Sequence, residues 1–546
     1  MPGLLLGPLL RYTGSTQATV WVETDGPCEV AVLAARARTF CVEGHHYALV
    51  VLQDLEEGAV RPYEVHLDGE RVWPPDDGRP PSTIHTREHE RRARLVFGSC
   101  RVGDPACEPY TLPPSEHELG FGIDALWAFS RRLQAGTEEW PDCLLLLGDQ
   151  VYADEASETT REFIRSRRDT SLPPGEQVAD FEEYTRLYRE AWSDPEIRWL
   201  LATVPSTMIF DDHDVHDDWN ISEAWVRDMR ATSWWDARIT GAFMAYWLYQ
   251  HIGNLAPPEL GDEPLLARFA GVEDGGPLLR EFARAIDREP AASRFAFHRD
   301  FGRSRLIVID SRAARVLGDG RRDMVDEDEW NWIAEHARGR YDHLIIASTL
   351  PVFMTPGVDG FEAWNEAVCA GAWGSLAARL GERIRRALDL EHWPAFQRSF
   401  RTMVELLHEL AEGPDAPGTI AFIGGDVHTA YIAEVDVGER QVSRVFQIVC
   451  SPFRNPLAPK ERRVIRLFAT RAAGTACRAL ARAAGVRRPD VSWRLVTPLT
   501  FDNSVAVLEL DERRARVTIR RSAPEAADGG WPLETLHERD LTPERA

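Results

Sequence analysis

The sequence predicts a layered α/β domain preceded by a smaller all-β domain, and three observations lead to this fold class. Short alternating strands fill the first part of the chain, whereas continuous apolar runs alternate with helical stretches from about residue 94. The composition also fits, because 44% of the 546 residues are hydrophobic and 27% are charged, as in a globular protein with a large core. This composition excludes a disordered chain.

Residues 1–88 are predicted to form a β-sandwich of the immunoglobulin or fibronectin kind. Apolar and other residues alternate in ATVWVE (18–23), and further short strands are expected at 28–34 and 45–52. The Asp68-Gly69 pair is a hairpin turn signal. The proline- and glycine-rich stretch 73–82 is expected to link this domain to the next.

Residues 89–546 are predicted to form the layered α/β domain. Apolar runs of this kind are buried on both faces and belong to sheets covered by helices; they occur at 94–98, 143–148, 206–210, 305–310, 343–348 and 419–424. Residues 124–134 and 180–192 have helical spacing. The closing segments 504–510 and 515–521 are expected to form a hairpin that extends a sheet.

Several of these strands end in a polar cluster. The clusters are Ser99-Cys100-Arg101, the segment 149–154, the DDHD segment 211–214, Ser311-Arg312 and Asp426-Val427-His428. Ligands of α/β sheets bind outside the carboxyl ends of the strands, so we expect these clusters to converge on one site.

The residue types in these clusters are metal ligands. Oxygen, imidazole and thiolate donors suit a mixed site for a transition metal and a hard cation, and the spacing alone permits zinc or manganese. Asp149 follows a buried strand directly, where a carboxylate is unfavourable without a cation or hydrogen-bond donors. Its two oxygens could bridge two ions roughly 3.5–4 Å apart.

The ordered motifs resemble those of calcineurin-like metallophosphoesterases. GD-x-x-x-D at 148–154, DDHD at 211–214 and GGDVH at 424–428 are closest to the alkaline phosphatase D (PhoD-like) branch, as are Ser99-Cys100 and the tyrosine three residues after Asp149. The opening 7–24 and the segments 309–315, 391–396 and 450–456 are also similar to that branch, so the resemblance covers nearly the whole chain. It implies a metallophosphoesterase-type β-sandwich flanked by helices.

The resemblance also implies two metal ions, iron and calcium, and the residues that bind them. A ferric ion would be held by Cys100, Asp149, Tyr152 and His428. Asp149 would bridge to a second ion shared with Asp212 and Asp426, and Asp154 is a candidate for an additional calcium ion. His213 would stabilise the transition state or protonate the leaving group.

Each of these residues also has an ordinary structural interpretation. Cys100 could be a buried inert thiol, Tyr152 could be a core phenol, and Arg312 could either clamp a phosphate or pair with a carboxylate. Further acidic and imidazole groups crowd the DDHD motif, and we expect most of them to support the ligands or to be solvated loop residues: Asp211, Asp214, His216, Asp217 and Asp218.

The predicted function is metal-dependent hydrolysis of phosphoric esters by a hydroxide bound between two ions, as in a PhoD-like alkaline phosphatase or phosphodiesterase. Two alternatives are kept. The protein could act on monoesters only, or it could be a metal-containing binding or structural protein of the same fold.

Charge and targeting signals predict the partners and location. The net charge of −24 argues against a general nucleic-acid binder, and a small phosphate ester is the expected partner. The basic segment 459–488 could contact an anionic membrane, but we favour a helix packed by its Ile, Leu and Phe face. The first residues resemble neither a secretory nor a twin-arginine signal, which predicts a cytoplasmic protein.

Overall fold

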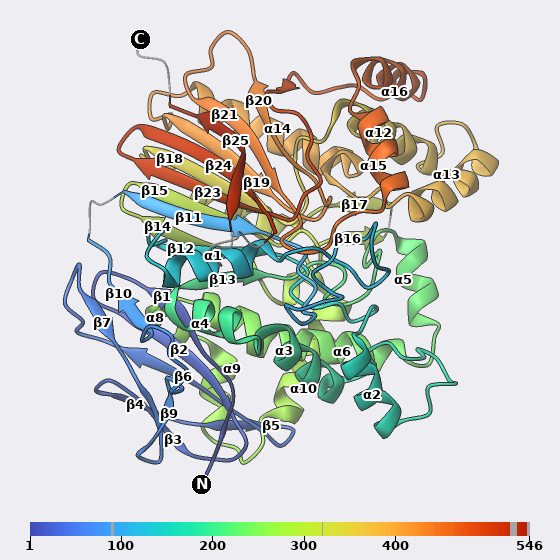
Figure 1. Cartoon of the computed structure of the whole chain (residues 1–546). Coiled ribbons are helices and arrows are strands. Elements are labelled where there is room, and N and C mark those ends of the chain that lie inside the picture. The colour runs from blue at the N-terminus through green and yellow to red at the C-terminus, as the bar shows by residue number, and fades with distance from the viewer. Residues whose placement is uncertain (89–91, 319, 525–531, 543–546) are drawn as a thin grey trace.

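The computed structural model describes residues 1–88, 92–318, 320–524 and 532–542 (Figure 1). The N-terminal region is a sandwich of two antiparallel sheets, in the strand orders β1-β2-β6-β5 and β4-β3-β8-β9, with β7 paired to β10. Its strands are β1 (Leu4–Thr13), β2 (Ala18–Thr24), β3 (Glu29–Val32), β4 (Ala35–Arg38), β5 (Phe40–Val42), β6 (His45–Leu52), β7 (Val60–Pro62), β8 (Val65–Leu67), β9 (Glu70–Trp73) and β10 (Thr83–His85). Val20, Val30, Val50 and Val65 lie in its core, so the predicted all-β sandwich is confirmed.

The predicted hairpin turn lies where the sequence placed it. Strands β8 and β9 pair antiparallel on either side of Asp68 and Gly69, whose φ angles are +48° and +91°. Glycine adopts this left-handed region freely, and aspartate tolerates it better than most other residues do.

The sandwich packs tightly on the rest of the chain. Leu6, Leu9 and Trp21 belong to the same hydrophobic cluster as residues of the α/β region. The Tyr63 hydroxyl donates a hydrogen bond to the Ala202 carbonyl at 2.5 Å. The two regions therefore share one continuous core.

The first central sheet contains the three predicted runs that precede residue 211. Its order is β13-β12-β11-β23-β24-β25, with β11, β12 and β13 parallel and the C-terminal strands antiparallel. The strands are β11 (Ala93–Gly98), β12 (Cys143–Leu147), β13 (Ser206–Ile209), β23 (Ser504–Asp511), β24 (Arg514–Ser522) and β25 (Leu533–Asp540). The predicted closing hairpin is thus confirmed as β23 and β24, which extend this sheet.

The second central sheet contains the three later runs. Its order is β14-β15-β18-β19-β21-β20-β22, and β15, β18, β19 and β21 run parallel. The strands are β14 (Phe297–Phe301), β15 (Ser304–Ile309), β18 (His343–Ser348), β19 (Thr419–Gly424), β20 (Ala430–Asp436), β21 (Arg444–Cys450) and β22 (Ser492–Leu495); a separate hairpin is formed by β16 (Val316–Gly318) and β17 (Arg321–Asp323). The two sheets face each other across one core that contains Leu95, Leu145, Ile345 and Ile423.

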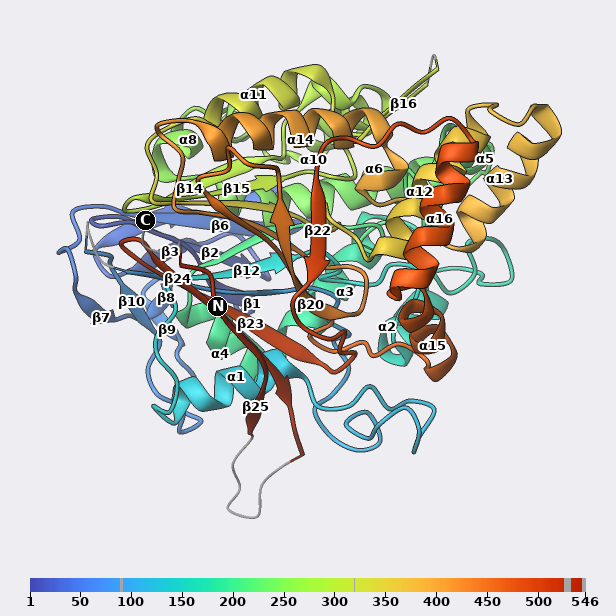
Figure 2. The same cartoon turned by 90° about the horizontal axis from the view of Figure 1, so that it is seen from above.

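Helices cover the outer faces of this sheet pair, as Figure 2 shows for α11 and α14. The helices outside the lobe described next are α1 (Ala125–Gln134), α2 (Glu158–Arg167), α3 (Phe181–Trp192), α4 (Pro195–Thr203), α5 (Glu223–Arg230), α6 (Trp235–Ala245), α7 (Ile252–Asn254), α8 (Pro257–Gly261), α9 (Pro264–Phe269), α10 (Gly276–Arg288), α11 (Glu327–Ala337) and α14 (Gln397–Glu412), with short turns η1 (Tyr246–His251), η2 (Pro290–Ala292) and η3 (Trp393–Ala395). Asp124 and Asp180 cap the two helices predicted at 124–134 and 180–192. The layered α/β architecture is therefore confirmed.

Four further helices form a lobe at one side of the molecule (Figures 1 and 2). They are α12 (Pro356–Cys369), α13 (Ser375–Ala387), α15 (Pro459–Phe468) and α16 (Arg471–Ala483). The prediction that 459–488 packs by its Ile, Leu and Phe face is only partly met in α16, which packs on the fold but buries Gly474 and Ala481. In α15 no side chain is fully buried, although the Phe468 ring packs against Phe361 of α12. None of the described helices is long and apolar enough to cross a bilayer.

Candidate metal centre

Three of the predicted ligands lie together at the carboxyl ends of β11, β12 and β19. One side-chain donor atom from each of Cys100, Asp149 and His428 lies within 4.8 Å of the others. Cys100 and Asp149 are fully buried. A thiolate, a carboxylate and an imidazole at this spacing can share one metal ion.

The backbone at these positions is unusual. Cys100, Asp149, Asp426 and His428 have φ angles of +56°, +49°, +61° and +46°, in the left-handed region that residues other than glycine rarely adopt. Such conformations cost of order 1–3 kcal/mol each and cluster at functional sites. Here they aim four potential donors inward from three loops.

Two glycines permit the loops to approach each other. A Cβ atom on Gly148 would lie 2.5 Å from the Cβ of Asp211, and one on Gly425 would lie 2.3 Å from the Ser99 hydroxyl oxygen. Gly148 also has a φ of +93°. Any larger residue at either position would push the ligand loops apart.

Asp149 lacks partners among the described residues. Its side chain is fully buried, and neither of its carboxylate oxygens has a hydrogen-bond donor. Burial raises the pKa of Asp149 well above its usual value, and the carboxylates of Asp212, Asp211 and Asp426 raise it further, against the lowering effect of His213. A cation between these oxygens would remove this penalty. The residues present therefore fit a metal site.

A second group of donors adjoins the first. Carboxylate oxygens of Asp149, Asp211 and Asp212 lie within 4.8 Å of one another, and all three residues are buried. Asp149 belongs to both groups, which is the arrangement that a bridging carboxylate requires. Asp211 was predicted as a supporting residue, and its proximity to the bridge could not be read from the DDHD spacing alone.

Arg312 lies among these carboxylates. The guanidinium is fully buried and pairs with Asp211 and Glu391, and its Nη2 lies 3.0 Å from Oδ1 of Asp212 and 3.9 Å from that of Asp426. The sequence left two interpretations of Arg312 open, and in the structure its guanidinium pairs with carboxylates. This cation positions the acidic groups and offsets their mutual repulsion.

The surroundings of Cys100 and Tyr152 come from the segment 450–456. The Ser451 hydroxyl donates to the Cys100 sulfur at 3.2 Å, and the Asn455 amide donates to the Tyr152 hydroxyl at 3.0 Å. Burial raises the pKa values of the thiol and the phenol well above their usual values, and the Asp149 carboxylate raises both further. Both groups would ionise only with a cation nearby. The sequence singled out this segment without assigning a role to either residue.

His213 and Asp154 form a pair at the edge of the site. Nδ1 of His213 lies 3.0 Å from Oδ1 of Asp154, which also accepts a hydrogen bond from the Asp217 backbone amide through Oδ2 at 2.7 Å. Burial lowers the pKa of His213, but Asp154, with smaller contributions from Asp212 and Asp149, raises it to well above its usual value. A role for Asp154 as a calcium ligand stays a prediction.

Asp217 differs from the sequence-based expectation of a solvated loop residue. Its side chain is 58% exposed, but Oδ1 lies 3.9 Å from Nε2 of His213. Donor atoms of Asp212, His213 and Asp217 also lie within 4.8 Å of one another. Asp217 is therefore a neighbour of the site as well as a solvated loop residue.

His392 is a neighbour of the site to which the sequence analysis assigned no role. Its Nε2 lies 3.6 Å from Oδ2 of Asp426, while Nδ1 lies 2.6 Å from the buried Glu362 carboxylate on α12. The segment 391–396 was noted for its resemblance, yet its position beside Asp426 depends on the packing of α12. His428, by contrast, has a pKa lowered to about 4 by burial, so its imidazole is neutral and available as a ligand at pH 7.

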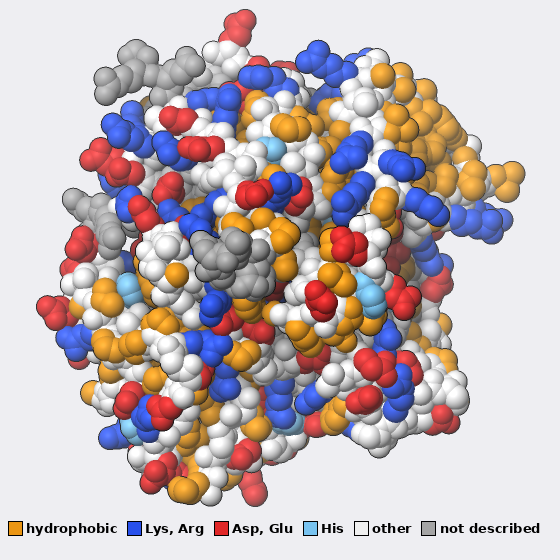
Figure 3. Space-filling model, viewed as in Figure 1, with side chains coloured by type: hydrophobic (Ala, Val, Ile, Leu, Met, Phe, Trp, Pro, Cys, Tyr) orange, Lys and Arg blue, Asp and Glu red, His pale blue; other side chains and the backbone are white. Residues whose placement is uncertain are grey.

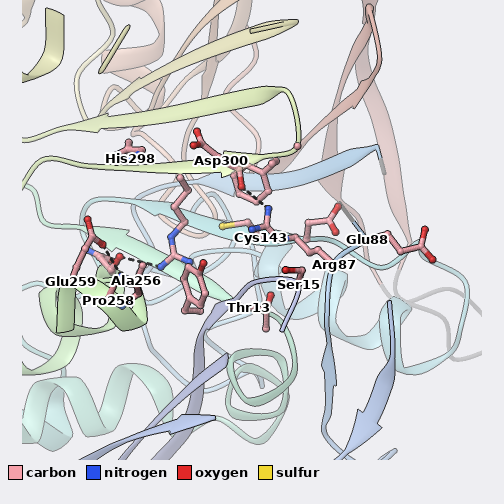
Figure 4. Close-up of a pocket in the computed structure, with 16 residues that line it drawn as sticks. Thr13, Ser15, Arg87, Glu88, Cys143, Ala256, Pro258, Glu259, His298 and Asp300 are labelled. Atoms are coloured by element: carbon pink, nitrogen blue, oxygen red, sulfur yellow. Dashed lines mark hydrogen bonds between the residues drawn. The ribbon is translucent and has the colours of Figure 1, made fainter. Parts of the chain in front are cut away.

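Two large cavities differ in their relation to these residues. A cavity of about 500 Å³ is lined by Tyr152 and Asp154 and by the segment 101–104. Another of about 510 Å³ lies between the end of β1, α8 and β14, where Thr13, Glu259 and His298 line it (Figure 4). None of the candidate ligands lines this second cavity. The first cavity is therefore the better candidate for substrate access.

Comparisons with known proteins found matches for the N-terminal sandwich and for part of the α/β region. Residues 127–275 match the family described as PhoD-like phosphatase, and residues 1–85 match a domain of unknown function, DUF7800. No curated protein matches the chain. The solved structure of PhoD is similar with a TM-score of 0.60 at 11% identity, over 100% of this chain and 93% of that one. The purple acid phosphatase PPD1 from yellow lupin (Lupinus luteus) seeds has a TM-score of 0.49 at 11% identity, over 98% and 74%.

Proposed function

We propose that the protein is a metal-dependent phosphoric ester hydrolase, from the premise that its residues 127–275 match the PhoD-like phosphatase family. The family match supports phosphoester hydrolysis in general terms, while the substrate and the metals are part of our proposal. The observation that carries it is the buried Asp149 carboxylate, which has no donor of its own and belongs to two groups of potential ligands.

We assign the ligands to two ions. Cys100, Asp149, Tyr152 and His428 would hold the first, and Asp149, Asp212 and Asp426 would hold the second. The family resemblance implies ferric iron for the first ion, and the all-carboxylate set suits calcium as the second. When bound, the ions would supply Lewis acidity toward the phosphoryl oxygens and the attacking water.

His213 would protonate the departing oxygen or stabilise the transition state. Asp154 fixes the ring through Nδ1 and raises its pKa, which keeps a proton on the imidazole at neutral pH. The proton on Nε2 is then available to a leaving group. Asp154 accordingly acts on the reaction through His213 in this proposal.

Arg312 would hold the carboxylates in place. It is fully buried and its three nitrogens face Asp211, Asp212 and Glu391. We therefore do not assign Arg312 a contact with the substrate. The positively charged guanidinium would keep the Asp212 carboxylate oriented toward the second ion site.

Turnover by the full-length protein tests the proposal. The protein, purified with its native metals, is assayed on bis(4-nitrophenyl) phosphate and 4-nitrophenyl phosphate, beside Asp149→Asn and the exposed-turn control Asp511→Asn. We expect hydrolysis that Asp149→Asn abolishes and Asp511→Asn preserves. Activity on the monoester alone would select the phosphomonoesterase alternative. Metal retention without turnover of either ester would select the binding or structural alternative.

A further inference from the structure

Helix α13 exposes large apolar side chains beside arginines on one face. Leu376 and Leu380 are 80% and 58% exposed. Arg379 and Arg383 are also exposed and complete the spacing i, i+3, i+4, i+7, which places all four side chains on one side of the helix. A leucine stripe of this kind is normally turned toward a core.

Helix α15 repeats the same arrangement. Val464 and Leu467 are 53% and 62% exposed, and Lys460 and Arg463 complete the same spacing on an exposed face. None of the side chains of α15 is fully buried by neighbouring parts of the fold. Two helices from distant parts of the sequence thus present matching apolar and basic faces.

Partly exposed aromatic rings join the two faces. Phe468 of α15 lies 5.6 Å from Phe361 of α12, centroid to centroid, and Phe361 lies 5.1 Å from Trp364. Trp364 in turn lies 5.7 Å from Trp373, which precedes α13 and is 44% exposed. Figure 3 shows hydrophobic side chains gathered over this lobe at the upper right, with basic side chains along their edge. The patch is therefore continuous rather than a set of isolated residues.

The charge of the lobe is opposite to that of the whole protein. Residues 459–488 contain nine basic residues and one acidic residue, whereas the chain carries a net charge of −24. Arg379, Arg383 and Arg463 form no ion pair with any carboxylate among the described residues. Their charges are therefore available to an anionic partner.

We propose that the lobe formed by α12, α13, α15 and α16 docks the protein on an anionic lipid membrane. Amphipathic helices with leucine, tryptophan and phenylalanine on a face edged by lysine and arginine bind at the interface of headgroups and acyl chains. The arginine stems can follow the apolar surface while the guanidinium groups reach lipid phosphates. Leu376, Leu380, Val464 and Leu467 would enter the interface.

The lobe is also connected to the candidate metal centre. Helix α12 carries Glu362, which is fully buried and bonded to His392 beside Asp426. Docking through this lobe would bring the candidate metal centre close to a membrane surface. The docking itself does not depend on the proposed hydrolase function.

Vesicle flotation of the full-length protein tests the proposal. The vesicles are phosphatidylcholine alone or phosphatidylcholine with phosphatidylglycerol. We expect binding to the anionic vesicles only. Leu376→Glu and Leu467→Glu should each lower the partition coefficient about tenfold or more, and Arg463→Glu should lower it about fivefold or more. Circular dichroism and metal content should be unchanged, because these side chains lie at the surface.

Two exposed residues outside the lobe provide matched controls. Leu172 and Val442 are 62% and 64% exposed, so Leu172→Glu and Val442→Glu should bind vesicles as the unaltered protein does. Absence of the unaltered protein from floated anionic vesicles at low salt would overturn the proposal. So would equal losses in the lobe variants and the controls. A dimer in solution that Leu376→Glu converts to a monomer, without vesicle binding, would instead assign the patch to a second copy of the chain.

Discussion

Two buried charges in this molecule, Arg11 at the junction of the N-terminal sandwich and Asp149 at the candidate metal centre, have opposite surroundings. Both side chains are fully buried. The Arg11 guanidinium donates to the carbonyls of Ser206, Tyr249 and Gln250 at 3.1, 2.6 and 2.8 Å. Asp149 receives no hydrogen bond on either oxygen from the described residues.

The difference supports a structural role for Arg11 and the functional role that we propose for Asp149. A buried charge is unfavourable unless hydrogen bonds or an opposite charge replace its hydration. Arg11 obtains these contacts within the fold and links the N-terminal sandwich to the α/β region. Asp149 has no hydrogen-bond donor of its own, and its backbone lies in the left-handed region, which supports our proposal that a metal ion supplies its counter-charge.

The largest expected effect is that of Asp149→Asn. The change removes a negative charge from the proposed bridge and nearly preserves its volume, so metals should be lost and activity should be abolished. Folding should persist, because an unfavourable buried charge is removed. Activity assays, elemental analysis and thermal unfolding measure the three effects, with Asp511→Asn as control. Full metal content in Asp149→Asn would show that the bridge is misassigned.

His213→Ala should separate a proton donor from a ligand. We expect the metals to remain and the rate on alkyl esters to fall about 10²–10⁴-fold, because a basic leaving group needs a proton. The loss on nitrophenyl esters should be clearly smaller. An equal loss on both esters would make His213 an electrostatic stabiliser, and departure of the metals would make it a ligand.

Arg11→Met should lower stability without affecting the metals, whereas Asp149→Asn should remove the metals without unfolding the protein. Several buried carbonyls would lose their donor, at about 1–3 kcal/mol for each group left unsatisfied. The midpoint of denaturant unfolding should therefore fall while metal content and activity per folded molecule stay constant. Arg36→Met, whose exposed side chain pairs loosely with Glu29 at 3.8 Å, should leave the midpoint unchanged. Metal loss in folded Arg11→Met would contradict the purely structural role that we assign to Arg11.

Asp154→Asn should change the pH dependence of the reaction. Asp154 raises the pKa of His213, so its removal lowers that pKa and the imidazolium deprotonates at lower pH. The alkaline limb of the rate profile on alkyl esters should then move to lower pH, with about tenfold lower activity at its former optimum. Loss of calcium with an unshifted limb would instead support the predicted ligand role.

The smallest expected change is that of Tyr152→Phe. If Tyr152 is a ferric ligand, as the family resemblance implies, the protein should be coloured and the absorption band should shift or bleach in the variant. Tyr341→Phe, in which a half-buried phenol distant in sequence is changed, should keep the band. A colourless, active and iron-free protein would remove iron from the assignment while leaving the hydrolase proposal intact.

Much of this arrangement could be predicted from sequence because it depends on local patterns. Apolar runs marked the strands, and polar residues directly after them marked one edge of two sheets. Contacts between distant segments had no such signal. Arg11 lies in an ordinary strand, and the approach of Asn455 to Tyr152 depends on the packing of separate loops. The sequence also did not show that one face of α15 is exposed, because its apolar residues have the same spacing as those of a helix packed on a core.

The most direct test of the central claim is reconstitution of the metal-free protein. Metals are removed by chelation, their identity and amount are determined by elemental analysis, and hydrolysis of bis(4-nitrophenyl) phosphate is followed as they are returned. We predict that activity is lost with the metals, returns in proportion to their binding, and never returns in Asp149→Asn. Full hydrolysis by metal-free protein, or full recovery in Asp149→Asn, would contradict the account.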